Sequence, residues 1–571
     1  MGFSIFAGGV LNLLHWSRPF AVSALVLGGC AIQLFLTVRT WERPCWKHHY
    51  LWYFLLALPL LLQYAAAVIW PGPFNLCDDY LAYMAFPRRM LETGTFLDPF
   101  SVRRIAAYGG NSFLQAQIQI VGAEGNSHLL DIGLCPLIIA ALVLGHLRPR
   151  RHRDFAVAML LVWGILSIEI PRTNTMSALT GATLFLALFR TMAAADDDRS
   201  SGKWEIVTAI TAAAVSTIRA TYWPAALGAL VLAELAKALE TKGHWGWHVR
   251  RLARVLGYFI LCLAPWMILH FLSSHSFLYP LMLGNHQPNY TIFSRGLTFS
   301  QTLAWISSIF GRYPITILLV LPGLLGLWWK RSFWRNALPF CATLFSVCLV
   351  IIGKFNWIPE HELLRHIIPF ILPVFIVALL AILGDPAGGV PNPVRMGAAI
   401  LALWILAMNL PRDLQFRGRM VTYLREPRAL VFQQALRDYY RRIQESVPPG
   451  KAVFSVVDHP FLFDLGRNPV SPVDVVGACS PPPGMPFFKG PAALKAYLRS
   501  LALDYVAVVD FKQSIGLYSR KAWIGHSHGD DHPIYQFESP YFFDFMDNME
   551  ALQRTERLVF AEGPVKVLQL R

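Results

Sequence analysis

Charged residues are scarce in this sequence. Only 15% of its 571 residues are charged and 55% are hydrophobic, whereas soluble proteins average about 25% charged residues. The mean hydropathy is +0.43, and the apolar residues gather in runs, many close to the ~17–25 residues that cross about 30 Å of hydrocarbon. The scarcity of charge therefore argues against a soluble protein and predicts a polytopic α-helical membrane protein.

Cysteine patterns that hold metals are also lacking. The eight cysteines form no Cys-x-x-Cys pair and show no zinc-like spacing. Several lie inside apolar segments, where a thiol serves as a small core residue. Cys77 and Cys479 both fall on the predicted outer side, and a disulfide between them is an alternative in an oxidising compartment.

What charge there is carries one dominant sign. The formal net charge is +15, which in a soluble protein would suggest a nucleic-acid ligand. Here the basic residues cluster in short loops between apolar segments, the distribution typical of cytoplasmic loops. The clusters are Arg148, Arg150, Arg151 and Arg153; Lys237, Lys242, Arg250, Arg251 and Arg254; and Lys330, Arg331 and Arg335. The charge therefore reports membrane topology, and we expect no nucleic-acid partner.

The hydropathy pattern predicts about twelve membrane spans. They are Phe20–Val38, Leu51–Trp70, Leu129–Leu147, Phe155–Ile170, Met176–Arg190, Ile206–Thr217, Tyr222–Ala236, Val255–Leu272, Pro314–Trp329, Ala337–Ile352, Ile367–Leu383 and Met396–Leu410. With the basic loops inside, residues 71–128, 273–312, 353–366 and everything after 411 lie outside. The N-terminal residues 1–16 either lie along the interface or form an extra crossing.

Two domains follow from this division, a membrane domain over residues 1–410 with an outer loop at 71–128, and an extracytoplasmic α/β domain over residues 411–571. The second is predicted because strands alternate with helices after the last span. We expect helices at 427–448 and 491–501, strands at 451–457 and 505–510, and a final hairpin at 557–570.

The acidic pair Asp78–Asp79 opens the first outer loop, a few residues after an apolar segment. A surface helix is predicted over Tyr80–Glu92, kinked by Pro87, with Arg88 and Arg89 near lipid headgroup phosphates; Gly94 ends it. One or both carboxylates either cap this helix or act as a general base or a ligand for a cation. The residues alone leave these alternatives open.

A span, then an acidic pair, then a helix of this type over residues 76–100 resembles the GT-C superfamily of integral-membrane glycosyltransferases. The nearest comparison is with bacterial aminoarabinose transferases and protein O-mannosyltransferases. Phe277–Asn285, in an outer loop after a span, and Glu362–His366, immediately before another span, support the resemblance. It implies a sugar transferred from a polyprenyl-phosphate donor to a glycan, lipid or protein acceptor on the outer face, with Asp79 or Asp78 as the base.

The resemblance also implies cationic ligands for the donor phosphate, since the leaving group is anionic. The candidates are Arg365, His366, Lys354, Arg172 and Arg219, and the candidate donor or acceptor pocket comprises Glu362, Tyr80 and Arg88. Each has a structural alternative. Glu362 can pair with Arg365 or His366 at helical spacing, and an arginine at a helix end commonly extends to the membrane interface.

A histidine-rich segment near the C-terminus is the remaining candidate site. His526, His528, Asp530 and His532 are residue types that hold zinc or manganese. However, the segment has no second ligand cluster and is predicted as a polar loop. A divalent metal is therefore possible but not indicated.

The sequence thus predicts an integral-membrane glycosyltransferase, in a bacterial inner membrane with its site on the periplasmic face. A lipid or polysaccharide transporter or flippase with an extracytoplasmic domain is the alternative. Transporters often show paired halves and broken helices, and no internal duplication is evident here. A structural or assembly protein is a third possibility.

Overall fold

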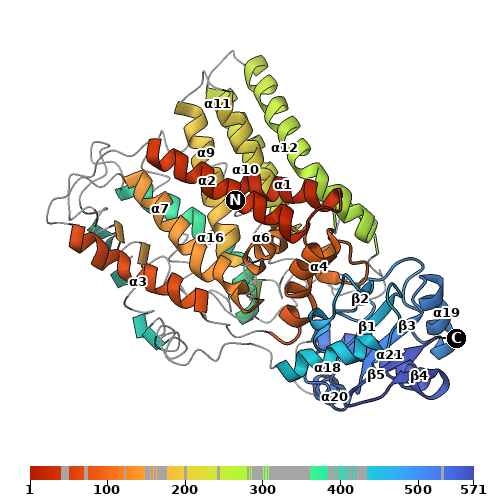
Figure 1. Cartoon of the computed structure of the whole chain (residues 1–571). Coiled ribbons are helices and arrows are strands. Elements are labelled where there is room, and N and C mark those ends of the chain that lie inside the picture. The colour runs from red at the N-terminus through yellow and green to blue at the C-terminus, as the bar shows by residue number, and fades with distance from the viewer. Residues whose placement is uncertain are drawn as a thin grey trace.

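The computed structural model shows a bundle of helices joined to a mixed sheet covered by helices (Figure 1). It describes residues 1–39, 50–69, 75–120, 124–147, 177–197, 202–240, 245–279, 284–285, 360–383, 434–528 and 533–570, with scattered positions in 155–163, 282–307 and 393–418. All structural statements below concern these residues.

The long helices of the bundle are mostly apolar. They are α1 (Gly2–Leu13), α2 (Pro19–Arg39), α3 (Tyr50–Ile69), α7 (Cys135–Leu147), α9 (Ala178–Asp197), α10 (Lys203–Ile218), α11 (Tyr222–Glu240), α12 (Trp245–Ser274) and α16 (Glu360–Leu383). Shorter elements connect them, namely η1 (Asp79–Tyr83), α4 (Ala85–Thr93), α5 (Val102–Ile105), α6 (Gly110–Gln119), η2 (Glu124–His128) and η3 (Leu129–Leu134). Of these, η1 and η3 are π-helical and η2 is a 3₁₀ helix.

Helix α10 lies at the centre of the bundle and contacts α1, α9, α11 and α12. Its buried face carries alanines at 209 and 212–214, and small side chains let neighbouring helices approach closely. Helix α1 is also an interior element. A Cβ atom at Gly8 would lie 2.3 Å from the ring of Phe113, and one at Gly9 would lie 2.7 Å from the indole nitrogen of Trp266.

The length of α1 bears on the two alternatives for residues 1–16. Its 12 residues span about 18 Å, which is shorter than the ~30 Å hydrocarbon layer, and this argues against an additional crossing by α1. One face of α1 contacts α10 and α12 while Phe3 is 63% exposed, and a position at the membrane interface stays a prediction.

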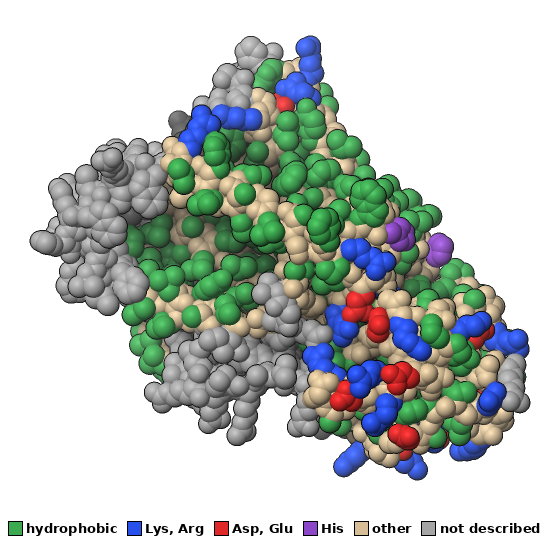
Figure 2. Space-filling model, viewed as in Figure 1, with side chains coloured by type: hydrophobic (Ala, Val, Ile, Leu, Met, Phe, Trp, Pro, Cys, Tyr) green, Lys and Arg blue, Asp and Glu red, His purple; other side chains and the backbone are tan. Residues whose placement is uncertain are grey.

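The face of the bundle seen in Figure 2 carries many apolar side chains. On α2, Phe20 is 87% exposed, and Leu27 and Leu34 are also exposed, as expected for side chains that meet lipid. Among the described residues, four helical segments are long and apolar enough to cross a membrane: Pro19–Arg39, Asn126–Gly145, Tyr222–Leu239 and Trp245–Ser274. These support an integral membrane protein. The total of about twelve spans stays a prediction, since several predicted spans lie outside the described residues.

The C-terminal unit, residues 434–570, is built on a five-stranded sheet with strand order β2-β1-β3-β5-β4. Its strands are β1 (Val453–Val456), β2 (Val470–Pro472), β3 (Tyr505–Val509), β4 (Arg557–Phe560) and β5 (Val565–Gln569). Strands β2, β1 and β3 are parallel, and β5 is antiparallel to both β3 and β4. The helices are α18 (Gln434–Glu445), η4 (Pro460–Leu462), α19 (Gly490–Ser500), α20 (Arg520–His528) and α21 (Pro533–Thr555).

The acidic segment, residues 75–93, joins the helix bundle to the C-terminal unit. Its apolar side chains belong to two different hydrophobic cores. Phe86 and Met90 pack into the core of the bundle. Leu81 and Met84 pack into the core of the C-terminal unit, together with Phe100 from the same outer loop. The segment therefore lies at the junction of the bundle and the sheet, rather than free on a membrane surface.

Candidate functional site at the junction of the bundle and the C-terminal unit

The acidic segment begins with a cap formed by Asn75. Its side-chain oxygen accepts hydrogen bonds from the backbone N–H groups of Cys77 and Asp78 at 2.7 and 3.0 Å. The Asp79 carboxylate in turn accepts a bond from the Asn75 N–H at 2.7 Å. This reciprocal arrangement resembles a capping box. One acid of the pair, Asp79, thus takes a structural role, and the cap itself is a residue that the sequence analysis did not single out.

The other acid, Asp78, is held by Arg103. The Arg103 Nε and Nη2 atoms donate to Asp78 Oδ1 at 2.8 and 2.5 Å. The Asp78 side chain stays 15% exposed, whereas Asp79 is 0% exposed. Exposure to solvent therefore distinguishes the two adjacent acids.

Arg103 is fixed from its other side by Asp474 of the C-terminal unit. Asp474 accepts bonds from the Ser101 hydroxyl at 2.6 Å and from the N–H groups of Val102 and Arg103 at 2.9 and 3.1 Å. Its carboxylate also lies 3.2 Å from Arg103 Nη1. A carboxylate from the sheet therefore caps helix α5, whose own cap residue is Ser101.

Electrostatics at Arg103 follow from these contacts. Burial would lower the pKa of its guanidinium, but the charges of Asp78 and Asp474 outweigh this effect and raise the pKa above the usual range. Arg103 consequently carries a fixed positive charge between two carboxylates, one from each part of the molecule.

Tyr80 and Arg88, two of the predicted pocket residues, contact the C-terminal unit. The Tyr80 ring lies 4.8 Å from that of His459 and 5.6 Å from that of Phe461, both in the C-terminal unit. Burial and the nearby Asp79 charge raise the pKa of Tyr80, and burial lowers the pKa of His459. Arg88 donates to the backbone carbonyl of Phe461.

The predicted surface helix is also wrong in two respects. The chain forms the π-helix η1 and then α4, and Pro87 falls in the first turn of α4, where its missing N–H has no intrahelical partner to lose. Arg89 does not meet headgroup phosphates. It is buried, lies 3.3 Å from Asp98 and donates to the carbonyl of Val470 at 2.7 Å. Gly94 ends α4 in the left-handed conformation, φ +84°, as predicted.

Two of the predicted phosphate ligands meet at the end of the bundle. Arg219 follows the last residue of α10, and its Nη1 atom lies 2.7 Å from Nδ1 of His366 on α16. Tyr222, at the start of α11, lies within electrostatic range of Arg219 and of Tyr83 in the acidic segment. Tyr83 is likewise within range of Arg103. The N–H group of Ala220, next to Arg219, donates to the carbonyl of Ala106 at 3.0 Å, so the Arg219–His366 pair lies near the end of α5, the helix that carries Arg103.

The remaining phosphate and pocket candidates are not tested by the structure. Arg172 and Lys354 lie outside the described residues, as do the side chains of Glu362 and Arg365, although the backbone of both is in α16. Asp131, a residue that the sequence analysis did not consider, accepts hydrogen bonds from the N–H and hydroxyl of Thr180 at 2.7 and 2.9 Å. It therefore caps α9 as Asp474 caps α5.

The histidine-rich segment is partly helical, not a polar loop throughout. His526 and His528 belong to α20, while Asp530, His532 and the side chain of His528 lie outside the described residues. The His526 ring stacks on Tyr535 at 4.6 Å. Within the part of the chain that the structure describes, no three His, Cys, Asp or Glu side chains are placed to hold a metal ion.

The proposed Cys77–Cys479 disulfide is absent, since both thiols are free. Cys479 is buried, with its sulfur 3.4 Å from the carbonyl of Pro99. Nearby, Arg104 is fully buried and lies over the Phe96 ring at 4.1 Å. Burial lowers its pKa to about 9, with Asp98 opposing the shift, so Arg104 remains charged at neutral pH.

Sequence reasoning missed Asn75, Arg103 and Asp474. An Arg pair in the same outer loop as an acidic pair was a visible signal for Arg103. Nothing in the sequence pointed to Asp474, which is separated from Arg103 by 371 residues.

Comparison with family models and with curated proteins finds no match. Solved structures similar to this chain include ArnT from Cupriavidus metallidurans bound to undecaprenyl phosphate, with 12% identity, 91% of this chain and 98% of that chain covered, and a TM-score of 0.45. They also include the oligosaccharyltransferase AglB from Archaeoglobus fulgidus in complex with an inhibitory peptide and a dolichol-phosphate, with 11% identity, 85% and 72% coverage, and a TM-score of 0.43. Both are GT-C superfamily glycosyltransferases. TM-scores below 0.5 carry no functional argument, so function is inferred from the contacts described above.

Proposed function

We propose that this chain is an integral-membrane glycosyltransferase that moves a sugar from a polyprenyl-phosphate donor to an acceptor hydroxyl or amine. Its site lies at the end of the bundle next to the C-terminal unit, the end that the basic loops predict to be outside the cytoplasm. In a bacterium this would be the periplasmic face of the inner membrane.

The observation that carries the proposal is a pair of oppositely charged sites near one end of an apolar bundle. The Asp78 carboxylate is partly exposed and held by Arg103. The Arg219–His366 pair is partly buried, and Ala220, next to Arg219, donates a backbone hydrogen bond to Ala106 at the end of α5, the helix that carries Arg103. A reaction between a nucleophile that loses a proton and a leaving group that gains negative charge needs both kinds of site.

The chemistry assigns one role to each site. The acceptor gives its proton to Asp78 as its oxygen or nitrogen forms a bond to the anomeric carbon. The bond between that carbon and the phosphate oxygen breaks, and the electron pair leaves with the lipid phosphate. Arg219 stabilises this phosphate by charge-assisted hydrogen bonds, and His366 orients the guanidinium.

Asp78 is a better base than Asp79 for two physical reasons. Its carboxylate reaches solvent, whereas Asp79 is inaccessible. Asp79 also holds the backbone N–H of Asn75, so approach of an acceptor to Asp79 would require the cap to open.

Binding of undecaprenyl phosphate to the full-length protein in nanodiscs tests the proposal. We expect native mass spectrometry to show a lipid adduct with the wild type, and Arg219→Ala to weaken binding by about tenfold or more, as the loss of a charge-assisted hydrogen bond requires. Arg254→Ala is the matched control. This arginine lies in α12 and pairs with Glu205 of α10, so it is engaged away from Arg219 and His366.

Two results would overturn the proposal. One is equal binding by Arg219→Ala and Arg254→Ala. The other is an Asp78→Asn protein that still releases undecaprenyl phosphate at the wild-type rate from undecaprenyl-phosphate-linked sugars. A lipid bound by wild type and moved between leaflets without loss of its sugar would instead support a flippase.

A further inference from the structure

We propose that Asp474 of the C-terminal unit is a positioning residue for the transfer reaction, acting on Asp78 through Arg103. This inference rests on the proposed function, in which Asp78 is the base. It makes the C-terminal unit part of the catalytic machinery rather than an appended binding module.

The contacts form a continuous relay from the sheet to the acidic segment. Asp474 follows strand β2 and is 1% exposed. Its contacts to the Ser101 hydroxyl, to the N–H groups of Val102 and Arg103 and to the Arg103 guanidinium fix both the start of α5 and the direction of the Arg103 side chain. Arg103 then places two of its nitrogens on a single oxygen of Asp78.

The contact with Arg103 sets the orientation of Asp78. Arg103 Nε and Nη2 both donate to Asp78 Oδ1, and these two charge-assisted hydrogen bonds fix the position of that oxygen. Without Asp474, Arg103 would lose its anchor to the sheet, and the orientation of Asp78 would no longer be fixed.

Other ionisable groups of the C-terminal unit face the same arginine. Glu538 on α21 is buried within electrostatic range of Arg103, and burial raises its pKa to about 8, with the Arg103 charge opposing. Burial also raises the pKa of Tyr518, which lies within range of Asp474, Asp458 and Arg103. Glu538 and Tyr518 are therefore largely neutral at pH 7, and Asp458 is engaged by Ser514 and Ile515.

The groups facing Arg103 from the acidic segment are Asp78 and Tyr83, with Cys77 near Tyr518. Among these groups, the carboxylates in direct contact with Arg103 are Asp78 and Asp474. Both carboxylates interact with the positive charge of Arg103. In Asp474→Asn, the carboxylate of Asp78 no longer competes with that of Asp474 for this charge, which favours the ionised form of Asp78.

The test is the pH profile of kcat and kcat/KM for Asp474→Asn in the full-length protein. We expect kcat to fall by about 10- to 100-fold, the scale on which misplacement of a reacting group acts. The KM for the lipid donor should stay unchanged. The acid limb of the profile should move to lower pH by about half a unit or more, a change that a merely structural role would not produce.

Three companion variants make the result decisive. Asp78→Asn combined with Asp474→Asn should lose no more activity than Asp78→Asn alone, because both changes act on one group. Asp510→Asn is the matched control, since the Asp510 carboxylate accepts bonds from the neighbouring Lys512 and Gln513; it should leave kcat and the pH profile unchanged. Ser101→Ala weakens the same cap without removing charge and should lower kcat about two- to fivefold, with no shift of the acid limb.

The outcomes separate this inference from the proposed function. An inactive Asp78→Asn with wild-type kcat and pH profile in Asp474→Asn overturns the relay and leaves the transferase intact. A fully active Asp78→Asn overturns both. If Asp474→Asn does not fold, wild-type kcat in Ser101→Ala overturns the relay.

Discussion

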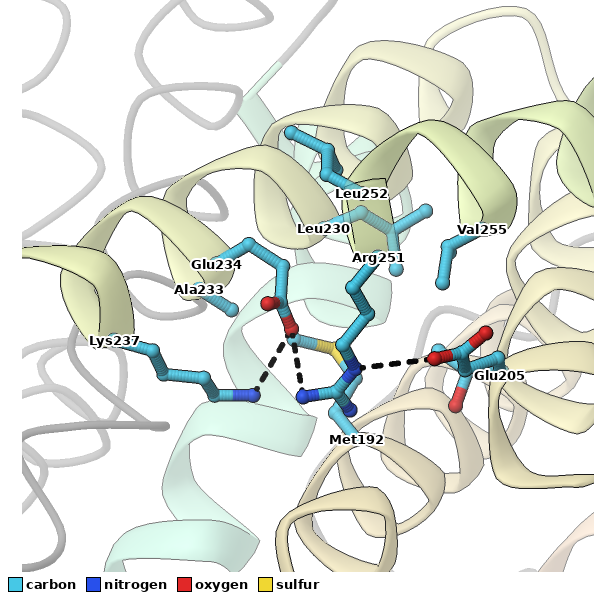
Figure 3. A pocket seen from close by; sticks show the side chains of 10 residues that line it. Met192, Glu205, Leu230, Ala233, Glu234, Lys237, Arg251, Leu252 and Val255 are labelled. Atoms are coloured by element: carbon cyan, nitrogen blue, oxygen red, sulfur yellow. Dashed lines mark hydrogen bonds and ion pairs between the residues drawn. The ribbon is translucent and has the colours of Figure 1, made fainter. Parts of the chain in front are cut away.

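The two ends of the helix bundle both carry clusters of charge, but the clusters are built differently. At the end away from the C-terminal unit, Glu205 and Glu234 share the cations of α11 and α12 (Figure 3). Glu234 lies within 3.3 Å of Lys237, His248 and Arg251. Glu205 receives two bonds of 2.9 Å from Arg254. These ion pairs, called the inner network below, bind α10, α11 and α12 to one another.

At the other end, ion pairs connect the bundle to the C-terminal unit. The chain Asp78–Arg103–Asp474 joins the acidic segment to the sheet, and its terminal carboxylate is partly exposed. In the inner network, each glutamate has at least two cationic partners, and apolar side chains such as Leu230 and Val255 line the remaining space. The two clusters differ in what they join: one holds helices of the bundle together, and the other connects the bundle to the C-terminal unit.

The largest effect should distinguish the two adjacent acids. Asp78→Asn removes the proton acceptor and should lower kcat by about 10²–10⁴-fold. Asp79→Asn should keep most of the kcat and cost about 1 kcal/mol of stability through its cap. Transfer rates and thermal unfolding of both variants provide the measurement. The opposite ranking of the two rates would make Asp79 the base.

The inner network should affect stability and not catalysis. Glu234→Gln leaves Lys237 and Arg251 with a neutral partner and should lower the free energy of unfolding by about 1–3 kcal/mol, with kcat unchanged. Glu445→Gln, which removes one charge of an exposed ion pair on α18, is the control and should have little effect. A large loss of kcat in a stable Glu234→Gln protein would mean that the inner network also affects catalysis, which contradicts the proposed difference between the two ends.

Stability near the reactive end should depend on pH through Glu538. Its pKa is about 8 in the folded protein against 4.5 for the free side chain, so the folded state holds the proton more tightly. The stabilising contribution is present below about pH 4.5 and is lost as pH rises through 8, by up to about 1.4 kcal/mol per pH unit. Relative to wild type, Glu538→Gln should therefore gain melting temperature between pH 5 and 9. A constant difference would contradict the burial of this carboxyl.

The smallest effect should come from the cap of the acidic segment. Asn75→Ala removes the acceptor for two N–H groups and should cost about 1 kcal/mol of stability, while Asn75→Asp should retain the cap. Thermal unfolding measures both. Equal stability of Asn75→Ala and wild type would mean that the segment is held from the C-terminal unit alone.

Local patterns predicted much of the secondary structure. The apolar run at 20–38 became α2, and the strands expected at 451–457 and 505–510 appear as β1 and β3. The final hairpin is formed by β4 and β5. The pattern failed for α21 (Pro533–Thr555), which has Pro540 inside it, because proline and dispersed aromatics obscure a helical period.

The candidate site could be predicted only where its residues act locally. The acidic pair, Arg219 and His366 were found because charges beside apolar runs are conspicuous. Arg88 and Arg89 were assigned to headgroups, since nothing in the sequence shows that a sheet 370 residues later covers them.

By itself, the sequence determined that this is a membrane protein with an acidic pair at the end of a span, because hydrophobicity and short-range spacing are properties of the chain. Only the tertiary structure decided that Asp79 is buried and bonded to Asn75 while Asp78 stays partly exposed. Side chains find their partners through long-range packing, and Asp78 depends for its orientation on a carboxylate that the chain brings back from residue 474.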